Sequence, residues 1–116
     1  MELEDVRDAL VEFQPVTALV AGSIYYLQVP ENSAAPYIVL KRISTEPQRS
    51  LTGSTGEEPT QFIVECWAPT YTAVIRLRDA ARAALEQAGL QMQLEAEEYD
   101  SVVRLHSVVQ HWILWD

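Results

Sequence analysis

The stretch QFIVECWAPT, residues 61–70, decides the fold. Its first seven residues are mostly strand formers, and side chains along a strand point alternately to its two faces. The predicted strand therefore carries the side chains of Phe62, Val64 and Cys66 on one face, and those of Ile63, Glu65 and Trp67 on the other. Thr70 is of the residue type that caps a helix N-terminus. The stretch predicts a strand that passes directly into a helix.

The helix predicted after Thr70 carries an apolar stripe at helical spacing. The stripe consists of Val74, Leu77, Ala81, Ala84 and Ala88, and the charged residues Arg76, Asp79, Arg82 and Glu86 lie outside it. Small alanines allow the helix to pack closely on a sheet, and Gly89 is a typical C-terminal stop.

A second strand is predicted upstream at residues 37–44, where YIVLKRIS follows Pro36. Both of its faces begin apolar and end polar, which indicates a strand that leaves the core toward solvent. We expect it to pair antiparallel with residues 61–67. Residues 45–60 then form the connection between the two strands.

That connection, TEPQRSLTGSTGEEPT, has little apolar character beyond Leu51. Loops of this length without internal structure are uncommon in compact domains. It is either a flexible loop that merely joins the two strands or an arm that orders against a neighbouring subunit, and the sequence favours neither. The candidate contact residues of such an arm are Arg49, Leu51, Thr52, Gly53, Ser54, Glu57 and Glu58.

The two ends of the chain complete the pattern. Residues 3–13 predict an amphipathic helix that Pro15 ends, and residues 16–21 one further helical turn closed by Gly22, before a strand at residues 23–29. At the C-terminal end we expect three elements: a half-buried strand at 90–94, an acidic turn at 95–101 and a long strand at 102–115.

The order of these elements indicates one α+β domain over residues 1–116. We expect an antiparallel or mixed sheet of about five strands packed against two helices, with the long loop between two central strands. The expected core residues are Leu10, Val39, Val64, Cys66, Trp67, Leu77, Ala81 and Val109.

The charge balance is acidic, with 8 Lys and Arg against 17 Asp and Glu and a net charge of −9. A protein that binds nucleic acid tightly needs a basic face, so direct binding is disfavoured, although an acidic channel would let DNA slide through. The lone Cys66 excludes an intrachain disulfide. The acidic N-terminus is the reverse of a signal peptide, so we expect a cytoplasmic protein with no membrane contact.

The sequence contains no familiar motif of catalysis, so we expect no catalytic residue, metal or cofactor. His106 and His111 should point to opposite faces of one strand, which prevents them from sharing a metal. Arg76 and Arg82 are candidates for contact with acidic groups of another subunit. A solvated helix face with local ion pairs is the other reading of these arginines.

Several segments, in order, resemble one family. They are residues 21–25, 36–40, 42–44 and 64–71, then Leu77, Ala80, Arg82, Ala84 and Leu85, and the closing strand with Trp112. Their order and spacing resemble the tail-completion, or tail-terminator, proteins of siphophages. The resemblance implies a non-enzymatic virion protein that forms a ring, commonly of six subunits, on the head-proximal end of the tail tube. The implied partners are copies of itself, the tail tube protein and the head–tail connector protein, with DNA passing through the lumen without specific binding.

Two hypotheses follow from the resemblance and the composition. Residues 45–60 would pack against a neighbouring ring subunit or the tube. The lumen would be net negative, and a solved ring whose lumen is lined by Arg76, Arg78 and Arg82 would refute this.

Other readings stay open. A head–tail connector or stopper, or a minor tail subunit, would share the size and acidity of this chain. A small ligand- or peptide-binding module is a different class, and a thermal-shift screen with metabolites would reveal it. Its pocket would use aromatic residues: Tyr25, Tyr26, Tyr37, Trp67 and Trp112. An enzyme ranks third, because the sequence places no second catalytic group opposite Glu65.

Overall fold

The computed structural model describes residues 2–43 and 60–114. Its elements, in chain order, are α1 (Leu3–Val11), α2 (Gln14–Val20), β1 (Ile24–Tyr26), β2 (Tyr37–Ile43), β3 (Thr60–Ala68), α3 (Tyr71–Gln87), β4 (Gln91–Asp100) and β5 (Leu105–Leu114). The strands form one open sheet in the order β1-β2-β3-β5-β4. Only β1 and β2 run parallel. The expected mixed α+β sheet is confirmed, with three helices in the described residues where two were expected.

Strand β3 lies at the centre of the sheet, as its apolar alternation requires. It pairs antiparallel with β2 from Tyr37↔Trp67 to Ile43↔Gln61, which confirms the predicted pairing. On its other side it pairs antiparallel with β5. Cys66 therefore sits between Ile38 of β2 and Val108 of β5, and all three are buried.

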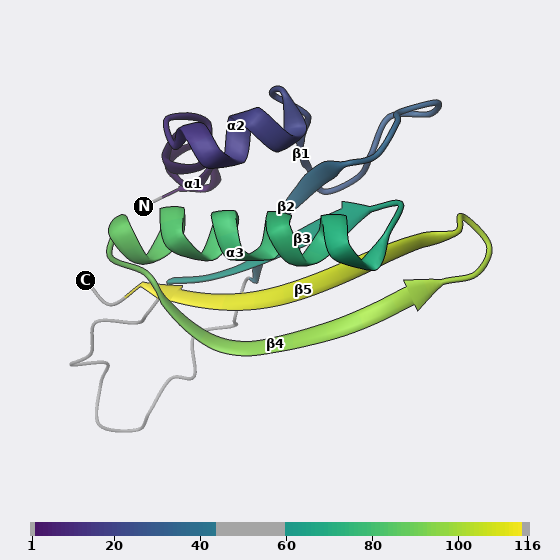
Figure 1. The fold of residues 1–116 in the computed structure, drawn as a ribbon. Helices are drawn as coiled ribbons and strands as arrows, with labels where there is room; N and C mark the ends of the chain where they lie inside the picture. Colours follow the sequence, from purple (N-terminus) through teal and green to yellow (C-terminus); the bar gives the residue numbers. More distant parts are fainter. Residues whose placement is uncertain (1, 44–59, 115–116) are drawn as a thin grey trace, which may run out of the picture.

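The three helices cover one face of the sheet, and α3 lies along it (Figure 1). The main core forms between this face and the helices. It combines α3 residues such as Leu77 and Ala81 with α1 residues such as Leu10 and strand residues such as Val64. Within residues 2–43 and 60–114, no helix covers the other face (Figure 1).

The capping of α3 follows the sequence. The Thr70 Oγ1 accepts a hydrogen bond from the Ala73 amide at 3.1 Å, which satisfies one free N–H of the first turn. Gly89 follows the last helical turn with φ +94°, a left-handed conformation that favours glycine.

The N-terminal prediction was wrong in detail. Pro15 does not end α1; it occupies the first turn of α2, where a missing N–H costs nothing. Helix α2 closes at Ala21, which is left-handed with φ 50°, and not at Gly22. Strand β1 is only three residues long, because Leu27 takes φ 68° and leaves the extended conformation.

The C-terminal prediction was wrong about the acidic turn. Residues 95–100 belong to β4, and the turn lies at residues 101–104 instead. Acidic side chains fit here because β4 is an edge strand, where charge reaches solvent. A register shift between Met92 and Leu94 places these two residues on opposite faces and leaves Leu94 exposed.

Candidate assembly surfaces

The structure places the residues predicted for assembly in different settings. Arg49, Leu51, Thr52, Gly53, Ser54, Glu57 and Glu58 lie outside the described residues. Arg76 and Arg82 are exposed on α3. The Arg82 Nε lies 2.8 Å from the Glu86 Oε1 one turn on, whereas Arg76 makes no ion pair within the described part of the chain. Arg76 is the more available of the two for contact with another chain.

Arg78 forms its ion pairs within the molecule, and two of them link α3 to β4. Its guanidinium lies 2.9 Å from Asp79, 3.5 Å from Glu97 and 3.9 Å from Glu95. The hydrogen bond with Asp79 is the main cause of a raised pKa for Arg78. The Arg78 side chain is 23% exposed, but Asp79 is 62% and Glu97 44% exposed, so water partly screens these contacts.

A chain of polar groups continues from Arg78 into the core. The Gln110 Nε2 donates to the Glu95 Oε1 at 3.0 Å, and the Trp112 indole N–H donates to the Gln110 Oε1 at 3.0 Å. Gln110 and Trp112 are both fully buried. Gln110 therefore supplies the hydrogen-bond partner that a buried indole needs.

Replacing Gln110 by leucine should lower the free energy of unfolding by about 1–3 kcal/mol. The leucine fills similar space but leaves the buried Trp112 N–H without an acceptor. Urea denaturation of the purified variant measures the loss. Gln91→Leu, at an exposed position of β4, is the matched control and should change stability by less than about 0.5 kcal/mol. Equal stability of Gln110→Leu and the parent chain would contradict this role.

The sheet face without helices carries a row of aromatic side chains. Tyr25 meets Tyr37 edge-on at 6.0 Å between ring centroids, and Tyr37 stacks on Trp67 at 6.4 Å. Beside them the Lys41 Nζ and Glu65 Oε2 form a 2.7 Å ion pair, and the Trp67 indole N–H donates to the Glu65 Oε1 at 3.1 Å. Burial, followed by the charge of Glu65, raises the pKa of Tyr37.

The eight residues predicted as core divide between the two faces. Leu10, Val64, Cys66, Leu77 and Ala81 are buried in the core between sheet and helices. Val39 is buried, but it lies on the helix-free face together with Trp67 and Val109, which are half-buried. Strand periodicity separates the two faces, but it does not show which one the helices cover.

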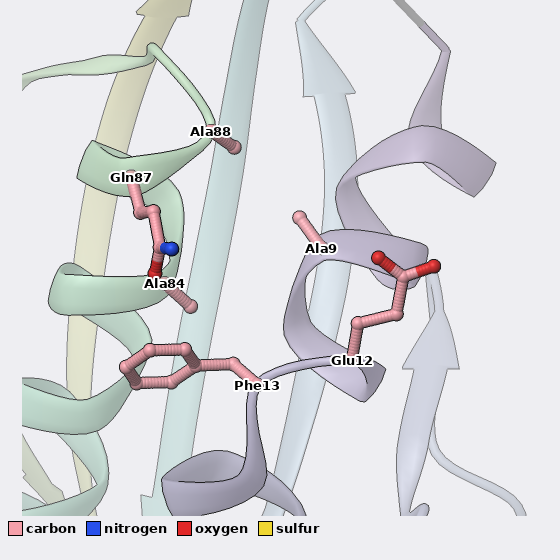
Figure 2. Close-up of a pocket in the computed structure, with 6 residues that line it drawn as sticks. All are labelled: Ala9, Glu12, Phe13, Ala84, Gln87 and Ala88. Atoms are coloured by element: carbon pink, nitrogen blue, oxygen red, sulfur yellow. The ribbon is translucent and has the colours of Figure 1, made fainter.

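Two hollows lie at opposite ends of α3. A groove of about 280 Å³ runs between α1 and α3, lined by Ala9, Glu12, Phe13, Ala84, Gln87 and Ala88 (Figure 2). A second hollow of about 240 Å³ lies near the first turn of α3. There the Tyr71 hydroxyl donates to the Glu97 carboxylate at 3.1 Å, which raises the pKa of Tyr71, and His106 packs against Tyr71 and Tyr99.

The strand register sets His106 on the helix side and His111 on the other, as predicted. Across residues 2–43 and 60–114 no cluster of three His, Cys, Asp or Glu side chains could hold a metal ion. Within the same ranges no helix is both long and apolar enough to cross a membrane.

The fold and these surfaces define a small α+β subunit with an open mixed sheet, helices on one face and an aromatic row on the other. The chain belongs to the tail completion protein gp17 family, whose model matches residues 4–113. It is therefore a structural component of a phage-type tail.

The same fold occurs in a solved structure described as the virion of a native gene transfer agent (GTA) particle. The likeness has a TM-score of 0.65 at 17% sequence identity, and it covers 93% of this chain and 88% of that chain. No curated protein matches the sequence.

Proposed function

We propose that this chain completes the phage tail by forming a ring on the head-proximal end of the tail tube, with six copies as the expected number. The observation that carries the proposal is the family match over residues 4–113, nearly the whole chain. The ring joins the tail tube protein to the head–tail connector protein, and it assembles in the cytoplasm of the bacterial host. Its work is binding, without a chemical reaction.

The shape of the subunit supports a ring. Its open sheet ends in two unlike edges, the three-residue β1 and the ten-residue β4. A contact between one edge and the other is head-to-tail, and such a contact closes into a ring when the rotation between copies allows it. The net charge of −9 supports the other part of the proposal, an acidic lumen through which DNA slides.

In vitro complementation tests the proposal. The purified protein is added to lysates that make tails but lack it, and joined virions are counted by electron microscopy. We expect restored joining, with tubes of uniform length capped at one end. If heads and tails join fully without the added protein, the proposal is overturned. If the protein is found only at other places in the particle, a connector or minor tail role is favoured instead.

Deleting residues 48–57 in the same assay tests the proposed assembly arm. We expect the deletion variant to stay folded, with the circular dichroism of the parent chain, but to complete no tails. The conservative change Glu31→Asp, at an exposed position outside residues 45–60, is the control and should leave joining unchanged. Normal joining by the deletion variant would show that the arm is dispensable.

A further inference from the structure

The turn between β4 and β5 projects beyond the rest of the sheet. Strand β3 ends at Ala68, which pairs with His106. In the described part of the chain, the residues between Tyr99 and Leu105 therefore have no third strand beside them. Figure 1 shows this hairpin tip reaching past the start of α3. Residues 99–105 therefore form a protrusion at one end of the molecule, called here the hairpin tip.

Hydrogen bonds fix the turn of the hairpin tip, which exposes two apolar side chains to solvent. The Asp100 Oδ1 accepts hydrogen bonds from the amides of Val102 at 2.9 Å and Val103 at 3.2 Å. Arg104 closes the turn with φ 58°. Val102 is 88% exposed and Val103 54%. Single exposed apolar residues are common on protein surfaces, but two adjacent ones held by a hydrogen-bonded turn provide a small apolar surface that a partner can cover.

The groove between α1 and α3 lies at the opposite end of α3. Its walls carry Phe13 and the small side chains of Ala9, Ala84 and Ala88, which leave room for branched apolar groups (Figure 2). Glu12 lies at the rim, and its carboxylate points away from α3 in Figure 2. The 17 residues of α3 separate groove and tip by about 25 Å, so the two cannot meet within one chain.

We propose that the hairpin tip of one copy inserts Val102 and Val103 into the α1–α3 groove of the next copy. The argument for a second copy is complementarity between the two ends. The tip offers apolar side chains followed by the cation Arg104. The groove offers Phe13 and three alanines, with the Gln87 amide among them and the anion Glu12 at its rim. This interface rests on the proposed ring and names the surfaces that would build it.

The geometry of this contact fits a ring better than a dimer. The hairpin tip lies beyond the start of α3 (Figure 1), whereas the groove lies beside the end of α3, so the two are different surfaces at opposite ends of the molecule. Each copy therefore keeps a free groove after its tip is seated, and the contact repeats until the ring closes. The Arg104–Glu12 pair would set the direction of insertion more than the affinity, as charged rims commonly do.

Cysteine cross-linking tests the contact directly. Val103→Cys and Ala88→Cys are combined in the full chain and oxidised, both in concentrated purified protein and on completed tails. We expect a ladder of covalent multimers that reductant collapses, because each copy then carries a linkable tip and groove. Pairing Ala88→Cys with Leu27→Cys, an exposed position away from the tip, is the control and should give no ladder. Absence of a ladder in both settings would overturn the interface.

Tail joining separates this interface from the proposed function. Reversing either rim charge, by Arg104→Glu or Glu12→Arg, should lower joining by about tenfold, since the repulsion recurs at every contact. The double reversal should restore it. Normal joining by the double variant Val102→Asp/Val103→Asp would refute the interface and leave tail completion intact. A cross-linked ladder from a protein that completes no tails would support the interface and overturn tail completion.

Discussion

Trp112→Ala should lower the free energy of unfolding by about 3–5 kcal/mol. Trp112 is the largest fully buried side chain among the described residues, and it lies between Phe62 of β3 and Met92 of β4 in the sheet register. Its removal leaves a cavity that the paired strands cannot close. It also removes the donor to Gln110, whose amide then has only Glu95 as partner. Urea or thermal unfolding of the purified variant measures the loss.

Trp67→Ala is the matched control for this experiment. Trp67 has the same size but is only half-buried, on the face that no helix covers. Its truncation should cost clearly less, about 1–2 kcal/mol, because less apolar surface leaves the protein interior. Equal losses at the two positions would show that the helix-covered core does not dominate stability.

The central strand and the long helix were predictable from sequence because one local rule decides each. Alternation places Phe62 and Val64 on one face of β3, and the structure buries both. Thr70 and Gly89 bracket α3 as cap residues should. In these segments the residue types, the spacing and the environment all favour the same conformation.

The ends of the chain were less predictable because tertiary context decides them. The run of acids at residues 95–100 has the composition of a turn, yet it forms an edge strand. Part of the reason is remote in sequence: Glu95 and Glu97 meet Arg78 of α3, and Glu95 also meets Gln110 of β5. A pattern within a short window contains no information about such partners.

The exposed tip was missed for a related reason. Val102 and Val103 precede an apolar strand, so they read as its first residues, yet the structure places them in the turn. The usable signal was Asp100 followed by Ser101, since an Asp side chain commonly accepts hydrogen bonds from amides just ahead of it. The groove had no local signal, because its two walls are about 70 residues apart.

Raising the pH above about 9 should destabilise the protein through Cys66. Burial is the main cause that raises the pKa of this thiol from 9.0 to about 12, and the nearby Glu95 adds to it. Between these values the unfolded chain loses the thiol proton while the folded chain keeps it. The unfolded state then binds fewer protons, so stability falls as pH rises, by about 1.4 kcal/mol per unit and about 4 kcal/mol in all.

Comparing the parent chain with Cys66→Ala between pH 7.5 and 10.5 isolates this contribution. The variant should be less stable at pH 7.5, since Cys66 fills core space between Ile38 and Val108. Its stability should nevertheless fall less steeply above pH 9, so that the gap between the two proteins narrows by about 2 kcal/mol at pH 10.5. Tyr37, whose pKa is also raised, titrates in both proteins and cancels in the difference. Parallel stability curves above pH 9 would mean that the thiol reaches solvent, and that the sheet between β2 and β5 opens more readily than its packing implies.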